Sequence, residues 1–261
     1  MEGVNHGVGY VFGTLLSIFL WKVDRQYIYY KINNFLKNKI FIKNVFMQIF
    51  YILVIVMLLL INVKNNEITN FITAFIVIDI SNTERKNLKK REKIKFYDSI
   101  ATISNSIVNG FVGPLFYILL LGNVYGIIYT IIFNVSLDEE FPLFKWINII
   151  LSIVPSVIVQ IVLYLVYVFR NKKSAMDFRG DYLVNLILRP LLNVDIIAAY
   201  VESVNFYYCM SQDDSNYVKS YGEYNNKINE KCIKDYLGIA YTICIITFIV
   251  FFILKVIMQG K

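Results

Sequence analysis

Residues 104–134 read SNSIVNGFVGPLFYILLLGNVYGIIYTIIFN, and no side chain in this stretch is charged. The stretch exceeds the roughly 20 apolar residues that a helix needs to cross a bilayer. It is nevertheless interrupted at Gly110, Gly113, Pro114, Gly122 and Gly126. Lipid tolerates unpaired backbone groups only where protein or a water-filled cavity satisfies them. A simple membrane anchor needs no such interruptions, so this stretch is the best candidate for a binding site or a packing core.

The composition of the whole chain is that of a membrane protein. It has 261 residues, of which 57% are hydrophobic, and its mean hydropathy is +0.55. Such values are typical of a polytopic membrane protein and not of a soluble globule. The sequence therefore predicts an all-α fold, a single helical bundle in the lipid bilayer that comprises residues 1–261. The net charge of +7 is attributed to Lys and Arg that flank membrane segments, so nucleic acid is not expected as a partner.

About six membrane segments are predicted from the apolar runs of the sequence. These runs are residues 8–21, 45–63, 68–80, a span within 107–133, 146–169 and 236–257. Two of them, 8–21 and 68–80, are shorter than the roughly 20 residues of a full crossing. The pattern therefore leaves room for one re-entrant segment among the six.

Lys and Arg are distributed unevenly over the loops between these runs. Six lie in residues 22–43, seven in 81–98 and nine in 170–235, whereas four are found elsewhere. The positive-inside rule places these three basic loops in the cytoplasm and both chain ends outside a bacterial cell membrane. The acidic residues 138–140 then belong to an outside loop.

Motifs for metal or nucleotide binding are scarce. The chain has no GxxxxGK[ST] phosphate loop, its only histidine is His6, and Cys209, Cys232 and Cys244 are widely spaced. No zinc site, disulfide framework or histidine-dependent triad is therefore predicted, and no metal ligand set is assigned. The short acidic clusters are interpreted as solvated loops.

Residues 101–117, ATISNSIVNGFVGPLFY, followed by Gly122 and Tyr129, resemble the central motif of the CobD/CbiB family. That motif runs E-[ST]-V-A-E-N-x-x-D-G, then A-P-L-F-[FY], then a glycine and a later tyrosine. The match is sharpest from Gly110 to Tyr117. Members of this family are integral membrane enzymes, the adenosylcobinamide-phosphate synthases. The resemblance implies a cobalamin-biosynthesis ligase that uses ATP and Mg²⁺ to join an aminopropanol-type amine to a carboxylate of a corrinoid.

The resemblance also implies where a substrate would bind. Asn105, Asn109, Gly110 and Pro114 occupy motif positions, and Thr83 corresponds to an upstream G-R-D-T motif of the family. These five residues are the predicted substrate-binding set, and no catalytic residue is assigned. The implied partner is a corrinoid or another small molecule at the membrane face. The only cofactors implied are the ATP and Mg²⁺ of a retained ligase activity, and the oligomeric state is left open.

Three carboxylates of the family motif are absent from this chain, where Ala101, Asn105 and Asn109 replace two glutamates and an aspartate. Mg²⁺ prefers oxygen ligands, usually carboxylates, and an amide can neither neutralise the cation nor act as a general base. We therefore expect the fold to persist without the ligase reaction. Three functions stay open: an active ligase, a non-catalytic regulatory or scaffolding protein like AmpE, and an unrelated transporter or immunity-type membrane protein.

The loop after Asn134 decides between two topologies. An ATP-dependent site requires this loop to face the cytoplasm, whereas a simple crossing by the preceding helix puts it outside. A re-entrant hairpin that breaks near Gly122 and Asn123 would return the loop to the cytoplasm. We expect the simple crossing.

Overall fold

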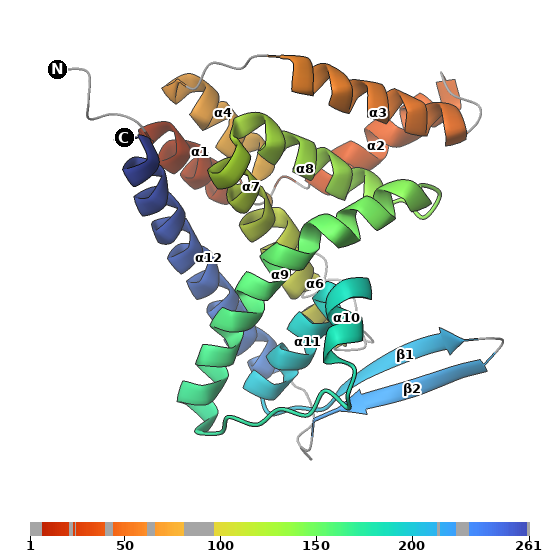
Figure 1. The fold of residues 1–261 in the computed structure, drawn as a ribbon, viewed down its shortest axis with the longest axis vertical. Helices are drawn as coiled ribbons and strands as arrows, with labels where there is room; N and C mark the ends of the chain where they lie inside the picture. The colour runs from red at the N-terminus through yellow and green to blue at the C-terminus, as the bar shows by residue number, and fades with distance from the viewer. Residues whose placement is uncertain are drawn as a thin grey trace.

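The computed structural model describes residues 7–20, 23, 25–39, 44–61, 66–80, 97–212, 215–222 and 230–259, and Figure 1 shows their arrangement. Within these residues almost all regular structure is helical, in agreement with the all-α prediction. The helices are α1 (Val8–Phe19), α2 (Arg25–Lys39), α3 (Asn44–Leu60), α4 (Glu67–Val77), α6 (Tyr97–Ile107), the π-helical turn η1 (Val108–Val112), α7 (Gly113–Leu121), α8 (Asn123–Ser136), α9 (Pro142–Asn171), α10 (Tyr182–Leu188), α11 (Pro190–Val201) and α12 (Glu230–Gln259). The exception is an antiparallel pair of strands, β1 (Phe206–Gln212) and β2 (Ser215–Tyr221).

Three helices are long and apolar enough to cross a membrane. They cover Ile100–Leu121, Pro142–Asn171 and Glu230–Met258, with 22, 30 and 29 residues. A crossing takes about 20 residues. The three helices overlap the last three predicted membrane segments, and α9 and α12 are the two longest rods in Figure 1. The chain thus has the helices of a membrane protein, and three of the six predicted crossings have helices of sufficient length.

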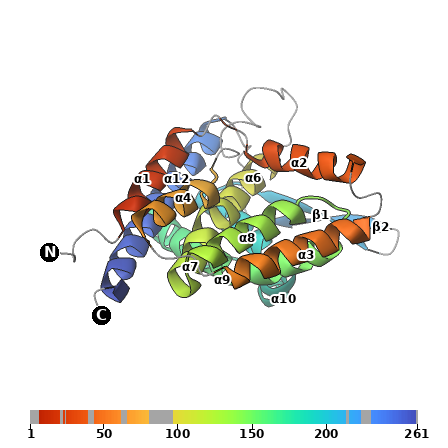
Figure 2. The ribbon, with the colours of Figure 1, turned by 90° about the horizontal axis from the view of Figure 1, so that it is seen from above.

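The helices at the first three predicted crossings are shorter. α1 has 12 residues, α3 has 17 and α4 has 11. Figure 2 shows α1 and α4 side by side and next to α12, with α2 and α3 on the other side of the molecule. The contact between α1 and α12 includes the rings of Tyr10 and Phe251, whose centroids lie 5.2 Å apart.

α1 and α4 pack closely because small residues lie at their contact. A Cβ atom at Gly9 would lie 2.2 Å from the carbonyl oxygen of Glu67, and one at Gly13 would lie 2.4 Å from that of Phe71. Two small residues four positions apart are the pattern that lets helix backbones approach in membranes. The Glu67 carboxylate also accepts the backbone N–H of Gly9, at the start of α1. Two short helices are thereby joined into one packing unit.

The helix from Tyr97 to Leu121 is continuous, but its central turn, η1, is π-helical. There the N–H of Gly113 donates to the carbonyl of Val108, five residues earlier. The carbonyl of Gly110 accepts the backbone N–H of Asp79 at 2.9 Å instead. A Cβ atom at Gly110 would lie 2.2 Å from the carbonyl oxygen of Asp79, so this contact requires glycine. The glycine of the family-like motif therefore serves the contact between α6–α7 and the segment after α4.

The crossing predicted within 107–133 lies instead at Ile100–Leu121, because the helix ends there and α8 begins at Asn123. Gly122 separates the two helices with φ 101° and ψ 179°, which residues other than glycine rarely adopt. α8 packs on α7, where a Cβ atom at Gly126 would lie 2.4 Å from a side-chain carbon of Ile118. The helix thus ends at Gly122, which is where the re-entrant topology requires a break between two helices.

An ion pair contradicts the predicted loop topology. Lys37 of α2 places its Nζ atom 2.7 Å from Oδ2 of Asp138 and 2.9 Å from Oε2 of Glu140. The prediction put residues 22–43 in the cytoplasm and residues 138–140 outside. A bilayer cannot separate two side chains that touch, so this part of the prediction is wrong.

The same ion pair also shows that two of the basic loops lie at opposite ends of α9. Lys37 and Asp138 lie at the end of α9 that begins with Pro142, whereas residues 170–235 follow its other end at Asn171. A helix of 30 residues is about 45 Å long. If α9 crosses the bilayer, then 22–43 and 170–235 lie on opposite faces, contrary to the expectation that all basic loops share the cytoplasm.

Two hydrophobic clusters fill the interior of the described part of the chain. The larger gathers side chains of α6, α7, α9, α11 and α12 and includes Val108, Phe111 and Leu115 of the motif stretch. The smaller joins α3, α8 and the start of α9 around Tyr51 and Phe144. Of the three long helices, the one at Ile100–Leu121 is the most enclosed, with 72% of its apolar window buried against 33% and 22% for the others. The motif stretch is therefore a packing core.

Candidate functional site

Two of the predicted substrate-binding residues, Asn105 and Asn109, belong to a chain of side-chain hydrogen bonds. The hydroxyl of Tyr129 donates to Oδ1 of Asn109 at 2.6 Å, and Nδ2 of Asn109 donates to Oδ1 of Asn105 at 2.6 Å. Asn109 is 1% exposed. The ring of Tyr129 also stacks on that of Tyr117, with centroids 5.0 Å apart. The amide groups of the motif thus bind other side chains of the protein.

The remaining motif positions are packed against protein as well. Pro114 is buried in the first turn of α7, where a missing N–H is tolerated. A Cβ atom at Gly113 would lie 2.4 Å from the hydroxyl of Tyr129, so this ring occupies the space beside the motif. The structure therefore brings Asn105, Asn109 and Gly110 together on one helix, whereas Thr83 lies outside the described residues.

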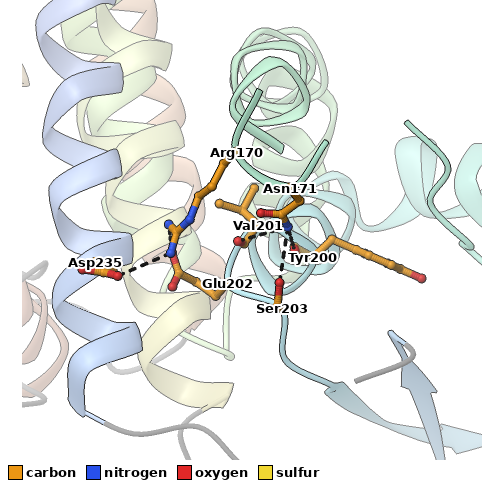
Figure 3. A network of polar contacts seen from close by, with 7 residues as sticks. All are labelled: Arg170, Asn171, Tyr200, Val201, Glu202, Ser203 and Asp235. Carbon is orange, nitrogen blue, oxygen red and sulfur yellow. Dashed lines mark hydrogen bonds and ion pairs between the residues drawn. The ribbon is translucent and has the colours of Figure 1, made fainter. Parts of the chain in front are cut away.

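A second polar cluster, which was not predicted from the sequence, lies where α9 and α11 end and α12 begins (Figure 3). Arg170 places Nη1 3.0 Å from Oε1 of Glu202 and Nη2 3.4 Å from Oδ2 of Asp235. The Glu202 side chain is only 1% exposed, whereas that of Arg170 is 40% exposed. One cation thus joins a buried carboxylate at the end of α11 to an exposed carboxylate of α12.

The neighbouring residue of α9 holds the end of α11 in place. Nδ2 of Asn171 donates to the carbonyl of Tyr200 at 2.8 Å and also lies 3.4 Å from the Ser203 hydroxyl (Figure 3). The last carbonyls of a helix have no partner within the helix, so a side-chain donor stabilises this end. Glu202, which follows α11 directly, is thereby fixed next to Arg170.

Asp195 lies on α11, seven residues before Glu202. Seven residues are about two helical turns, so both carboxylates lie on one face of the helix. Asp195 is 7% exposed, and its Oδ1 atom has no hydrogen-bond partner among the described residues. Its neighbour Ser104, on α6, shares a hydrogen bond of 2.9 Å with the hydroxyl of Tyr236 on α12. α6, α11 and α12 thus enclose a carboxylate with one unpaired oxygen.

Burial shifts both acids toward the protonated form. It raises the pKa of Asp195 to about 7, against a smaller opposing effect of the hydrogen bond from Ser104. It also raises the pKa of Glu202 to about 7, although the Arg170 guanidinium lowers it and Asp235 adds to the rise. α11 is too short to cross a membrane, so both groups lie outside the three spanning helices. Two carboxyls that exchange protons near neutral pH are therefore enclosed at this end of the bundle.

The sequence contains the signal for this cluster, two acids spaced by seven residues within an otherwise apolar run. Among the residues that the structure describes, no three His, Cys, Asp or Glu side chains gather in a way that would hold a metal ion. What the arrangement does offer chemically is an acid that can gain or lose a proton and a carboxylate paired with a partly exposed arginine.

Comparisons with known proteins leave the family open. No family model, no curated protein and no solved structure matches the chain. The resemblance to the CobD/CbiB family therefore rests on the motif residues quoted above.

Proposed function

We propose that this chain is a multi-pass protein of the bacterial cell membrane with CobD/CbiB ancestry, and that it acts without the ligase reaction. In this proposal it binds a small molecule or a partner protein in a regulatory or scaffolding role, for which AmpE is a precedent within the CobD/CbiB family. The motif helix supplies the packing core of the fold. The reaction of the ancestral enzymes is lost together with the three carboxylates.

The observation that carries this proposal is the position of Tyr129. Its hydroxyl is bonded to Asn109, and its ring fills the space next to Gly113. A substrate bound at the motif would have to displace this ring and break both hydrogen bonds of Asn109. A motif whose amides and glycines bind its own protein favours a structural role over substrate binding.

The membrane orientation is part of the proposal. The chain crosses the bilayer with the three long helices, one of which contains α7, while α1, α4 and α8 are each too short to cross alone. Residues 81–98 and 170–235, with seven and nine Lys and Arg, face the cytoplasm. The described helix ends next to these segments, which are the starts of α6 and α12 and the end of α9, lie toward one end of the bundle (Figure 1). This supports the placement of both segments on one face.

Complementation tests the loss of the ligase reaction. A bacterial strain that lacks its own adenosylcobinamide-phosphate synthase is given this chain and grown on cobyric acid. We expect no growth, although the chain is detected in the membrane fraction and the strain's own synthase restores growth in parallel. Growth supported by this chain would overturn the proposal and identify an active ligase.

Proton-coupled transport is a second candidate function. It is favoured by the Oδ1 atom of Asp195, which has no hydrogen-bond partner in the part of the chain that the structure describes. Ionisable groups enclosed among membrane helices are characteristic of ion and proton pathways. In proteoliposomes that contain a pH-sensitive dye and carry an imposed potential, this candidate predicts a proton flux that Asp195→Asn abolishes. A flux no larger than that of empty liposomes would eliminate it.

A further inference from the structure

A cleft of about 620 Å³ lies between α2 and the turn that joins α8 to α9. The exposed rings of Tyr27 and Tyr30 form its α2 wall. Asp138, Glu139 and Glu140 form the opposite wall. Small-molecule sites measure about 300–1,000 Å³, whereas a single metal ion needs far less room. The size of the cleft thus suits an organic ligand.

The walls of the cleft carry an excess of negative charge. Among the described residues that line the cleft, three carboxylates face one cation, Lys37, which gives a net charge of −2. Lys37 is bound to Asp138 at 2.7 Å and to Glu140 at 2.9 Å, whereas no described residue forms an ion pair with Glu139. A ligand that fits this cleft must therefore carry positive charge.

Asn134 adds a buried acceptor to the lining of the cleft. It lines the cleft, is 8% exposed, and donates through Nδ2 to the carbonyl of Thr130 at 2.8 Å. Its Oδ1 atom is buried and has no hydrogen-bond partner within the part of the chain that the structure describes. A buried acceptor without a donor is costly, so an N–H group supplied by a ligand would be stabilising here.

Together these features specify the chemistry of the ligand. A positive charge suits the carboxylates, and the ring of Tyr30 can attract a cation further. The ring of Tyr27 already has the Nζ atom of Lys31 over it, 4.8 Å from its centroid. A ligand that carries an N–H group can also pair Oδ1 of Asn134, which a quaternary ammonium ion cannot do. A net charge of −2 matches a ligand with two or more ammonium groups. We propose that the cleft binds a linear alkyl polyamine, with one ammonium group donating to Asn134 and another near Glu139.

Lys37 acts in this site as a built-in competitor. Its ammonium group occupies two of the three carboxylates that the ligand would use. Its removal therefore frees Asp138 and Glu140 and raises the negative charge of the cleft. The proposal therefore predicts that the removal of this lining residue increases the affinity for the ligand, whereas the removal of a lining residue usually lowers it.

Titration calorimetry with spermidine on the full chain, in a neutral detergent, tests the proposal. We expect saturable binding that Lys37→Gln tightens roughly fivefold and Glu139→Gln weakens about threefold. Lys145→Gln removes the same charge from an exposed residue of α9 that does not line the cleft, and it should leave the affinity unchanged. Thermal melting of each variant confirms that it remains folded.

Hexamethonium tests the role of Asn134, because this dication has two positive charges and no N–H donor. It should bind about tenfold more weakly than spermidine. The proposal is overturned by the absence of saturable spermidine binding to the wild type and Lys37→Gln, by weaker binding to folded Lys37→Gln, or by equal affinity for hexamethonium.

Discussion

Two polar regions of the molecule start from adjacent residues of the same helix and differ in their surroundings. Asn105 accepts a hydrogen bond from Asn109, which in turn accepts one from Tyr129, so neutral groups are linked to one another here. Ser104 faces α11 and α12, where Asp195 keeps an oxygen without a partner among the described residues. Hereafter these regions are the amide chain (Asn105, Asn109, Tyr129) and the acid cluster (Arg170, Asp195, Glu202, Asp235).

The difference shows where function is to be sought. Neutral amides and hydroxyls that satisfy one another are cheap to bury, and such a network fixes one packing arrangement. A buried carboxylate costs free energy even when it is paired, so stability alone does not explain its presence. The amide chain is thus explained by packing, whereas the acid cluster requires a functional reason.

The largest effect is expected at the helix that carries both regions. Gly110→Ala places a methyl group 2.2 Å from the Asp79 carbonyl oxygen, and backbone atoms cannot move away cheaply. We expect a loss of about 3 kcal/mol, the upper part of the range for overpacked sites. Thermal melting in detergent measures it. Gly238→Ala on α12, where nothing lies within 4 Å, is the control and should not lower the melting temperature.

A smaller effect is expected when the acid cluster loses its cation. Arg170→Gln leaves the buried Glu202 without its partner. Breaking a buried pair costs about 3–5 kcal/mol, and the partial exposure of Arg170 reduces our expectation to about 2 kcal/mol. Lys172→Gln, two residues away, should change little. The double variant Arg170→Gln/Glu202→Gln should recover most of the loss, and equal melting of the single and double variants would argue against the coupling.

The smallest effect is expected in the amide chain. Tyr129→Phe keeps the ring that fills the space next to Gly113 and removes only the hydroxyl bound to Asn109. An unsatisfied buried acceptor costs about 1 kcal/mol or somewhat more. That corresponds to a fall in melting temperature of about 2–4 °C. Tyr125→Phe, on the same helix with no hydroxyl contact described, provides the comparison, and indistinguishable melting of the two variants would show that the bond contributes nothing.

The long helices could be predicted from the sequence because hydropathy and length carry that information directly. Three of the predicted crossings overlap helices of at least 22 residues. The other three predicted crossings were based on apolar runs of similar composition. Their helices have only 12, 17 and 11 residues. The glycines that end or interrupt helices were visible, yet hydropathy does not say which of them allows a break, as at Gly122, and which allows a close contact, as at Gly110.

The contacts between distant segments could not be predicted. Lys37 and Asp138 are 101 residues apart, and only the fold shows that they pair. The substrate-binding prediction named Asn105 and Asn109, but it did not show that Tyr129 donates a hydrogen bond to Asn109. Asp195 was visible as an acid in an apolar run, but its unpaired oxygen depends on the packing of α6, α11 and α12.

The central claim is that the acid cluster contains groups that titrate, whereas the amide chain is neutral. The pH dependence of stability tests this claim most directly. An unfolded aspartate has a pKa of about 3.9, and burial raises that of Asp195 to about 7. Folding thus favours the protonated form, so this stabilisation is complete below about pH 4 and is lost as the pH rises to about 7.

The deciding measurement is thermal melting of the wild type and Asp195→Asn in detergent between pH 5 and pH 8.5. We predict that the melting temperature of the wild type falls as the pH rises toward 7. The Asp195→Asn variant should fall less steeply and melt at a higher temperature than the wild type at pH 8, while Tyr129→Phe runs parallel to the wild type. Parallel curves for the wild type and Asp195→Asn over the whole range would contradict the account.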